Sequence, residues 1–128
     1  MVLLDTCALL WLASDQSRLS ENAKNAVRKN AGALFVSAIT ALEIAIKCSR
    51  GKLTLPLPVL EWFVTALDSH GIQEIPVTGS LAVASVALPH RHNDPFDRII
   101  VATAELNGMK IISCDQQLAQ YEQVKVIW

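Results

Sequence analysis

The sequence predicts an α/β fold with a mainly parallel sheet and helices on both faces. Two observations support this prediction. Short apolar runs that suit buried strands alternate along the whole chain with longer segments that suit helices. The 128 residues contain no internal repeat, low-complexity tract or linker, and their number is close to the commonest domain size. We therefore expect one domain that spans residues 1–128.

Five short apolar runs are the expected strands. In chain order they are residues 1–4, 33–36, 72–77, 109–113 and 124–128. Asp5 stops the first run, Ser37 follows the second, and Cys114 with Asp115 stops the fourth. Pro76 lies near the end of the third run, and proline cannot donate a hydrogen bond to a sheet ladder, so this strand is not expected to be central.

Six helices are expected between the strands. They cover residues 7–13, 21–29, 38–49, 59–69, 80–88 and 95–106, and a short helical segment runs to about residue 120. Ser20 and Ser37 are favoured N-cap residues for the second and third helices. Gly51 and Gly71 follow the ends of the third and fourth, and Pro89 stops the fifth, as expected for residues that end helices.

The third helix carries an unusual carboxylate. Ile39, Leu42 and Ile46 have helical spacing and are expected to form the core stripe, with Glu43 on the same face. A glutamate inside an apolar stripe needs a partner or a cation, because burying an unpaired charge is costly. The alternative, that Glu43 sits at the edge of the stripe and reaches water, is also open.

The composition narrows the possible functions. Hydrophobic residues make up 52% of the chain and charged residues 18%, an apolar surplus that a homodimer or a tight protein partner would cover. The formal net charge of -1 excludes binding of polyanions through a bulk positive field. Any contact with nucleic acid therefore needs bound cations or local basic clusters, of which the candidates are Arg28 with Lys29, then Lys47, Arg50 and Lys52, then Arg91 with Arg98.

The cysteines and the N-terminal region favour a cytoplasmic protein. The three cysteines form no CxxC pair and lie in apolar surroundings, which indicates reduced, buried thiols rather than disulfides or a zinc site. No basic region precedes the apolar run at residues 7–13, which is too short for a signal sequence or a membrane span. We expect no membrane segment.

The charged start of the sixth helix has two interpretations. Asp94 suits the N-cap, Pro95 suits the first helical position, and Asp97 lies in the first turn, at the positive end of the helix dipole. Helix chemistry alone therefore explains both aspartates. The alternative is that this segment forms half of an active site, which requires support from other parts of the chain.

Acids at the ends of separate elements provide that support. Asp5 follows the first strand, Asp115 follows the fourth, and Glu43 lies two turns into the helix after the second. Ligands of parallel α/β sheets bind beyond the carboxyl ends of the strands, so these acids point to one edge of the sheet. Crowded carboxylates repel one another unless a cation joins them, and an oxygen-only set suits Mg²⁺ or Mn²⁺. The chemistry to expect from such a site is attack of water on a phosphodiester.

Other reaction classes fit less well. The chain has no Gly-x-Ser-x-Gly elbow and no glycine-rich phosphate loop. Cys7 stands where an aspartate-nucleophile phosphatase would carry a second aspartate. Hydroxyls beside the acids would orient carboxylates or hold water, or would simply cap helices and strands; they belong to Thr6, Ser37 and Ser113.

Four ordered motifs resemble the PIN domain, most closely that of the VapC-type toxins of bacterial type II toxin-antitoxin modules. They are VLLDT at 2–6, VSAITALEI at 36–44, HNDPFDRIIVATA at 92–104 and IISCD at 111–115. The resemblance covers essentially the whole chain. It implies a parallel-sheet α/β/α sandwich, metal-dependent endoribonuclease activity on RNA, a homodimer, and an antitoxin that inserts into or covers the groove.

The resemblance also implies roles for individual residues. Four acids would bind Mg²⁺ or Mn²⁺ as the catalytic set, namely Asp5, Glu43, Asp97 and Asp115, with the first and third as central ligands. Three hydroxyls would support these acids, at Thr6, Ser37 and Ser113. We expect Asp94 to be mainly a helix cap, and Arg98 to be a partner of the substrate or of a carboxylate.

Two other functions are kept as alternatives. One is a noncatalytic PIN-like binding module within a protein or RNA complex, although such a module has no reason to keep four acids at one sheet edge. The other is a DNA-directed nuclease, which usually needs a larger chain with extra elements that grip DNA.

Overall fold

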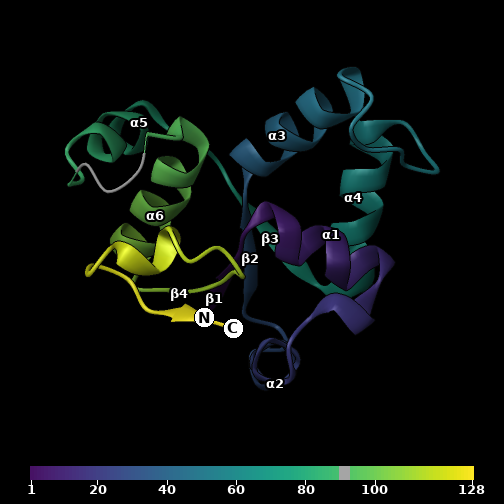
Figure 1. Cartoon of the computed structure of the whole chain (residues 1–128), viewed down its shortest axis with the longest axis horizontal. Coiled ribbons are helices and arrows are strands. Elements are labelled where there is room, and N and C mark those ends of the chain that lie inside the picture. The colour runs from purple at the N-terminus through teal and green to yellow at the C-terminus, as the bar shows by residue number, and fades with distance from the viewer. Residues whose placement is uncertain (90–92) are drawn as a thin grey trace.

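A five-stranded parallel sheet forms the centre of the protein in a computed structural model that describes residues 1–89 and 93–128. The strands are β1 (Val2–Leu4), β2 (Leu34–Ser37), β3 (Ile72–Ile75), β4 (Lys110–Ile112) and β5 (Val126–Ile127). Their order is β3-β2-β1-β4-β5 (Figure 1). The predicted α/β class with a parallel sheet is confirmed, and β3 lies at an edge, as Pro76 indicated.

Six α-helices occur in the described residues, near the predicted positions. They are α1 (Thr6–Ser14), α2 (Glu21–Lys29), α3 (Ala38–Ser49), α4 (Val59–His70), α5 (Gly79–Val86) and α6 (Pro95–Asn107), with two 3₁₀ turns, η1 (Gln16–Arg18) and η2 (Leu118–Gln120). Ser20 and Ser37 cap α2 and α3 as predicted, and Gly71 ends α4 with φ of 62°. None of the helices in the described residues is long and apolar enough to cross a membrane.

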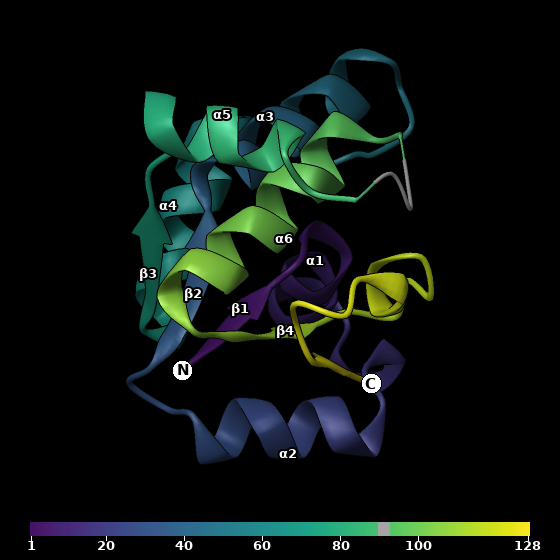
Figure 2. The same ribbon diagram turned by 90° about the vertical axis from the view of Figure 1, so that its left-hand side faces the viewer.

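The helices form two layers on opposite faces of the sheet (Figures 1 and 2). Because alternate strand residues point to opposite faces, Val2 and Leu4 pack with α1, α2 and α4, whereas Leu3 packs with α5 and α6. This is the α/β/α sandwich that the resemblance implied. The carboxyl ends of β1 and β4, which are neighbours in the sheet, lie between the two layers.

The predicted core stripe of α3 is confirmed at Ile39, which packs against the core, and is wrong at its other two positions. Leu42 is 48% exposed and Ile46 is only partly buried, whereas Thr40 and Ile44 are completely buried. Apolar side chains occur on nearly every side of α3, so periodicity alone did not define which face turns inward. The packing of α3 against α1, α4 and α6 selects the face that carries Thr40 and Ile44.

Candidate active site

Acidic side chains from several elements converge on one pocket of about 220 Å³ at the carboxyl ends of β1 and β4. Its lining residues are Asp5, Thr6, Cys7, Glu43, Lys47, Asp94, Asp97, Cys114 and Asp115. The chain leaves β1 and β4 toward opposite halves of the sheet, so the pocket lies at the topological switch point, where parallel α/β folds bind ligands. All four acids of the predicted metal site therefore line one pocket.

Asp5 is the most deeply buried of these acids, with 6% of its surface exposed. One carboxylate oxygen, Oδ1, accepts a hydrogen bond of 2.8 Å from the main-chain N–H of Ala8 and caps α1. The other, Oδ2, accepts a hydrogen bond from the Ser113 hydroxyl. Burial raises the pKa of Asp5 to about 6; the two hydrogen bonds oppose this, and the charges of Asp97 and Glu43 add to it.

Glu43 has the partners that a half-buried carboxylate requires. Its Oε1 accepts a hydrogen bond of 2.8 Å from the Thr6 hydroxyl, which lies 3.3 Å from the hydroxyl of Thr40. Its Oε2 lies 3.9 Å from Lys47 Nζ, one helical turn further along α3. Only 18% of the Glu43 side chain is exposed, so of the two alternatives for this residue the partnered one is observed.

Ser113 connects the ends of β4 and β1. Its hydroxyl, which is buried, donates to Asp5 and accepts a 2.9 Å hydrogen bond from the main-chain N–H of Asp115. Asp115 Oδ1 in turn accepts from the N–H of Gln117 at 2.9 Å. Ser113 does not line the pocket itself, but it orients one acid of the pocket and the backbone of another.

The start of α6 combines both interpretations of its sequence. Asp94 is the N-cap, accepting a 2.9 Å hydrogen bond from the N–H of Phe96, and Pro95 is the first helical residue. Asp97 lies in the first turn, half-buried, and lines the pocket together with Asp94. Capping therefore positions the carboxylate of Asp97. His92, the first residue of the motif, and Arg91, which was predicted to form a basic cluster with Arg98, lie outside the described residues.

Two expected supporting residues do not reach the pocket. Ser37 is fully buried and caps α3 by accepting from the N–H of Ile39 at 3.1 Å. Arg98 is 8% exposed and donates to main-chain carbonyls at the end of α5 and in the segment that follows. These hydrogen bonds give Arg98 a structural role, and its expected role as a partner of substrate or of a carboxylate stays a prediction.

The pocket also contains residues that the sequence did not assign to it. Cys7 and Cys114 are unpaired, and Cys114 is exposed, which corrects the expectation of buried thiols. Burial, followed by the charge of Asp5, raises the pKa of both thiols, so they are protonated and weak metal ligands at neutral pH. Lys47 was predicted only as a possible contact to nucleic acid, although its position four residues after Glu43 indicates the pairing.

The donor set of the pocket fits a hard divalent cation. Its acids present carboxylate oxygens, the ligands that Mg²⁺ and Mn²⁺ prefer, and the raised pKa of Asp5 reflects a buried carboxylate near other negative charges. Among the described residues, no three acids, histidines or cysteines are close enough to enclose a metal ion directly. Mg²⁺ usually keeps several waters and takes one or two carboxylates, so direct contact with every acid is not required.

Comparisons of the sequence with family models and with known proteins agree with one another. Residues 2–124 match the family model described as the PIN domain. The chain is 33% identical over 127 residues to Ribonuclease VapC22 of Mycobacterium tuberculosis (strain ATCC 25618 / H37Rv), spanning 98% of this chain and 95% of that protein.

Solved structures share the fold at lower identity. A toxin-antitoxin complex from Klebsiella pneumoniae contains a chain with a TM-score of 0.67 and 24% identity, covering 97% of this chain and 95% of that one. VapBC2 from Rickettsia felis, bound to a DNA fragment from its promoter, gives a TM-score of 0.71 and 12% identity, with coverage of 98% and 97%. Because the family model and a relative at 33% identity both extend over nearly the whole sequence, the chain belongs to the PIN-domain family.

Proposed function

We propose that this protein is a Mg²⁺- or Mn²⁺-dependent endoribonuclease that acts as the toxin of a toxin-antitoxin pair. The observation that carries the proposal is the convergence of Asp5, Glu43, Asp97 and Asp115, from four separate elements, on one pocket. The similarity to a protein named as a ribonuclease supports RNA as the substrate. The similarity to chains of toxin-antitoxin complexes supports the biological role.

In this proposal the four acids hold the divalent ion. When bound, the ion supplies an activated water and stabilises the charge that develops on the leaving oxygen of the phosphodiester. The residues around the acids fix their directions: Ser113 and the N–H of Ala8 bind the two oxygens of Asp5, and Thr6 binds one oxygen of Glu43. Lys47, the one basic residue among the described lining residues, supplies positive charge for the substrate phosphate.

A test of the proposal is the metal requirement of RNA cleavage. We expect the purified protein to cut RNA with Mg²⁺ or Mn²⁺, to stop in EDTA, and to recover when excess Mg²⁺ is added. The measurement is gel electrophoresis of an end-labelled RNA, with the RNA incubated in each buffer without protein as the control. Cleavage that continues at the same rate in EDTA would contradict the metal-dependent mechanism.

The noncatalytic binding module remains the second candidate, because the described residues contain no ready-made enclosure for a metal. It predicts that the acidic pocket binds no divalent ion at all. Titration calorimetry with Mn²⁺ separates the two functions: heat of binding that disappears when Glu43 is replaced by glutamine supports the nuclease, and no binding at millimolar Mn²⁺ supports the module.

Exposed apolar side chains support the proposed homodimer and antitoxin. One group lies on α3, on α4 and just before α4, and consists of Leu42, Leu57, Leu60 and Val64. A second lies on α5 and α6 and consists of Val83, Val86 and Leu106. Apolar surface of this kind usually marks a protein interface. We propose that a second copy and the antitoxin cover these two surfaces in the cytoplasm, where the proposed RNA substrate occurs.

The dimer has a direct test by sedimentation equilibrium. We expect the chain alone to sediment with twice its mass of 14.0 kDa. We also expect one of two double variants, Leu60→Ser with Val64→Ser or Val83→Ser with Val86→Ser, to sediment as a monomer while the other stays dimeric, because only one surface faces the second copy. A monomeric unmodified chain at 100 μM or so would contradict a stable homodimer, since specific dimers usually bind more tightly.

A further inference from the structure

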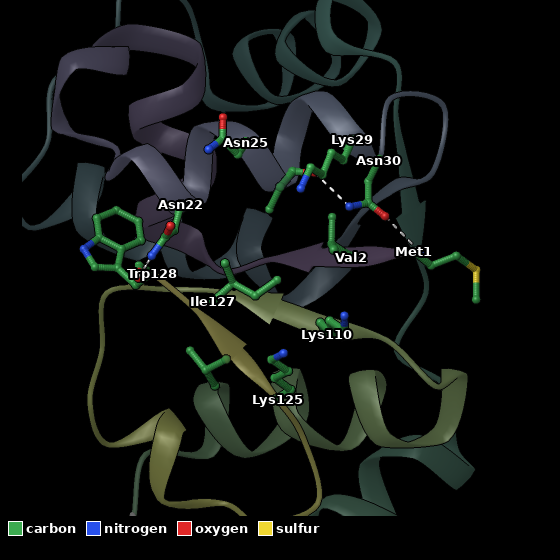
Figure 3. Close-up of a pocket in the computed structure, with 12 residues that line it drawn as sticks. Met1, Val2, Asn22, Asn25, Lys29, Asn30, Lys110, Lys125, Ile127 and Trp128 are labelled. Carbon is green, nitrogen blue, oxygen red and sulfur yellow. Dashed lines mark hydrogen bonds between the residues drawn. The ribbon is translucent and has the colours of Figure 1, made fainter.

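A larger pocket, of about 500 Å³, lies at the opposite end of the sheet from the acidic pocket. Figure 3 shows α2 along one side and the beginnings of β1, β4 and β5 along the other. Lys29 comes from the last turn of α2, Lys110 is the first residue of β4, and Lys125 directly precedes β5. No acidic side chain is found among the described residues that line this pocket.

None of the three lysines forms an ion pair within 4 Å in the described part of the chain. In the described part of the chain, the ion pairs within 4 Å are those of Lys24 with Glu21 and of Lys47 with Glu43, and neither involves this pocket. The three lysines place positive charge around one hollow, and this charge favours a bound anion. In a chain with a net charge of -1, such a concentration is not a consequence of composition.

The rest of the pocket is held in place by hydrogen bonds and ring packing. Asn30 Nδ2 donates to the Ala26 carbonyl at 2.8 Å, and Asn22 Nδ2 donates to the main-chain oxygen of Trp128 at 3.2 Å (Figure 3). Trp128 packs against Trp11 with their ring centroids 5.5 Å apart. One end of the pocket therefore has a fixed aromatic ring and its middle has lysines.

The size and chemistry of this pocket limit its ligand. Its volume lies in the range of small-molecule sites, roughly 300–1,000 Å³. Lysine is a common point-charge partner of phosphate, and three lysines suit an anion with more than one negative charge. An aromatic ring is a surface on which a nucleobase can stack.

We propose that this pocket binds a phosphate-bearing anion through Lys29, Lys110 and Lys125, with Trp128 at the end where a nucleobase would lie. The anion belongs either to a free nucleotide or to the backbone of a single-stranded RNA. Because Lys110 and Lys125 lie at the amino ends of β4 and β5, a ligand held by them is not the phosphodiester at the acidic pocket, which lies at the carboxyl ends of β1 and β4. Binding here does not depend on nuclease activity, and it is measurable whether or not the protein cleaves RNA.

The first experiment is calorimetric titration of the whole protein with sodium tripolyphosphate at low salt. EDTA is included, so that no divalent ion at the acidic pocket provides an alternative site. We expect the double variant Lys110→Gln with Lys125→Gln to weaken binding at least about tenfold, as loss of charge-assisted contacts predicts. The control, Lys24→Gln, removes a charge from α2 outside the pocket and is expected to change binding less than about twofold.

The second experiment locates the ligand and identifies its source. In ¹⁵N-correlated NMR spectra, tripolyphosphate is expected to shift the side-chain amides of Asn22 and Asn30 in the unmodified protein and not in the double lysine variant. ATP and a twelve-nucleotide single-stranded RNA are then titrated separately, and the tighter of the two identifies the natural source of the phosphate.

Three results would overturn the proposal. They are no binding of any of these probes at millimolar concentration, an equal loss of binding with Lys24→Gln, and shifts confined to Thr6 and Glu43 at the acidic pocket. Circular dichroism melting curves of the variants must match that of the unmodified protein, which is expected because these lysines are exposed.

Discussion

Asp5→Asn is expected to slow RNA cleavage strongly and at the same time to stabilise the metal-free protein. Loss of a central metal ligand should lower the rate by about two to three orders of magnitude, the scale on which removal of one preorganised charged or polar group acts. The gain in stability follows from the pKa of Asp5, which burial raises from 3.8 to about 6. Asparagine keeps the favoured N-cap chemistry for α1 without the buried charge.

The size of this effect depends on pH. Because the folded state holds the Asp5 proton more tightly than the unfolded state does, ionisation of Asp5 opposes folding above about pH 6. The opposition disappears as the pH falls through 6 toward 4. We therefore expect Asp5→Asn to raise the free energy of unfolding by about 1–3 kcal/mol at pH 8, and by much less at pH 4.5.

Urea unfolding in EDTA at the two pH values measures this difference. The matched control is Asp68→Asn, an exposed aspartate on α4, for which a change below about 0.5 kcal/mol is expected. A less stable Asp5→Asn protein at pH 8 would mean that the hydrogen bonds from Ser113 and Ala8 outweigh the burial of the charge.

Addition of Mg²⁺ should reverse the order of stability. A ligand at 100 times its dissociation constant stabilises the folded state by about 2.7 kcal/mol, and only the protein that keeps Asp5 would gain this. The variant would then be the more stable protein in EDTA, and in Mg²⁺ it would be both the less stable and the less active one. This pattern is specific to a buried carboxylate kept for metal binding, because an aspartate that only caps α1 would not respond to Mg²⁺.

Much of the fold was predictable because local chemistry determines its elements. Ser20, Ser37 and Asp94 cap helices where the sequence indicated, and the strand runs end at the predicted acids. The face of α3 was not predictable, because apolar residues surround that helix and only its neighbours determine which side is buried. Sequence patterns define the elements, and packing between elements defines their orientation.

The sequence predicted which acids line the candidate site, but it did not predict the hydrogen bonds that hold those acids in place. Asp5 and Asp115 follow strands, and parallel strands bring such residues together. The hydrogen bond from Ser113 to Asp5 joins residues 108 positions apart and depends on the register of β1 with β4. The partners of Arg98 depend in the same way on the packing of α5 against α6. Because the sequence does not show these partners, it led us to expect that Arg98 contacts the substrate or a carboxylate.

Arg98→Met is expected to lower the free energy of unfolding by about 3–4 kcal/mol, because removing one partner of a buried charged network leaves its acceptors unsatisfied. The guanidinium donates to the carbonyls of Val86 at 3.2 Å, Leu88 at 2.7 Å and Pro89 at 3.1 Å. It also lies 3.4 Å from the hydroxyl of Tyr121, which is buried in the same layer as α6. Methionine fills the space without replacing any of these bonds.

The measurement that separates structure from catalysis compares unfolding with cleavage for the same variant. Arg28→Met, at an exposed position on α2, is the matched control and should change stability by less than about 0.5 kcal/mol. Arg98→Lys should recover little, because one ammonium group cannot reach three carbonyls in the planar geometry of a guanidinium. If Arg98→Met left stability unchanged and abolished cleavage by the folded protein, Arg98 would belong to the substrate site. If it loses stability and the remaining folded fraction cleaves RNA at the normal rate, then the arginine beside Asp97 acts by holding the end of α5 against α6.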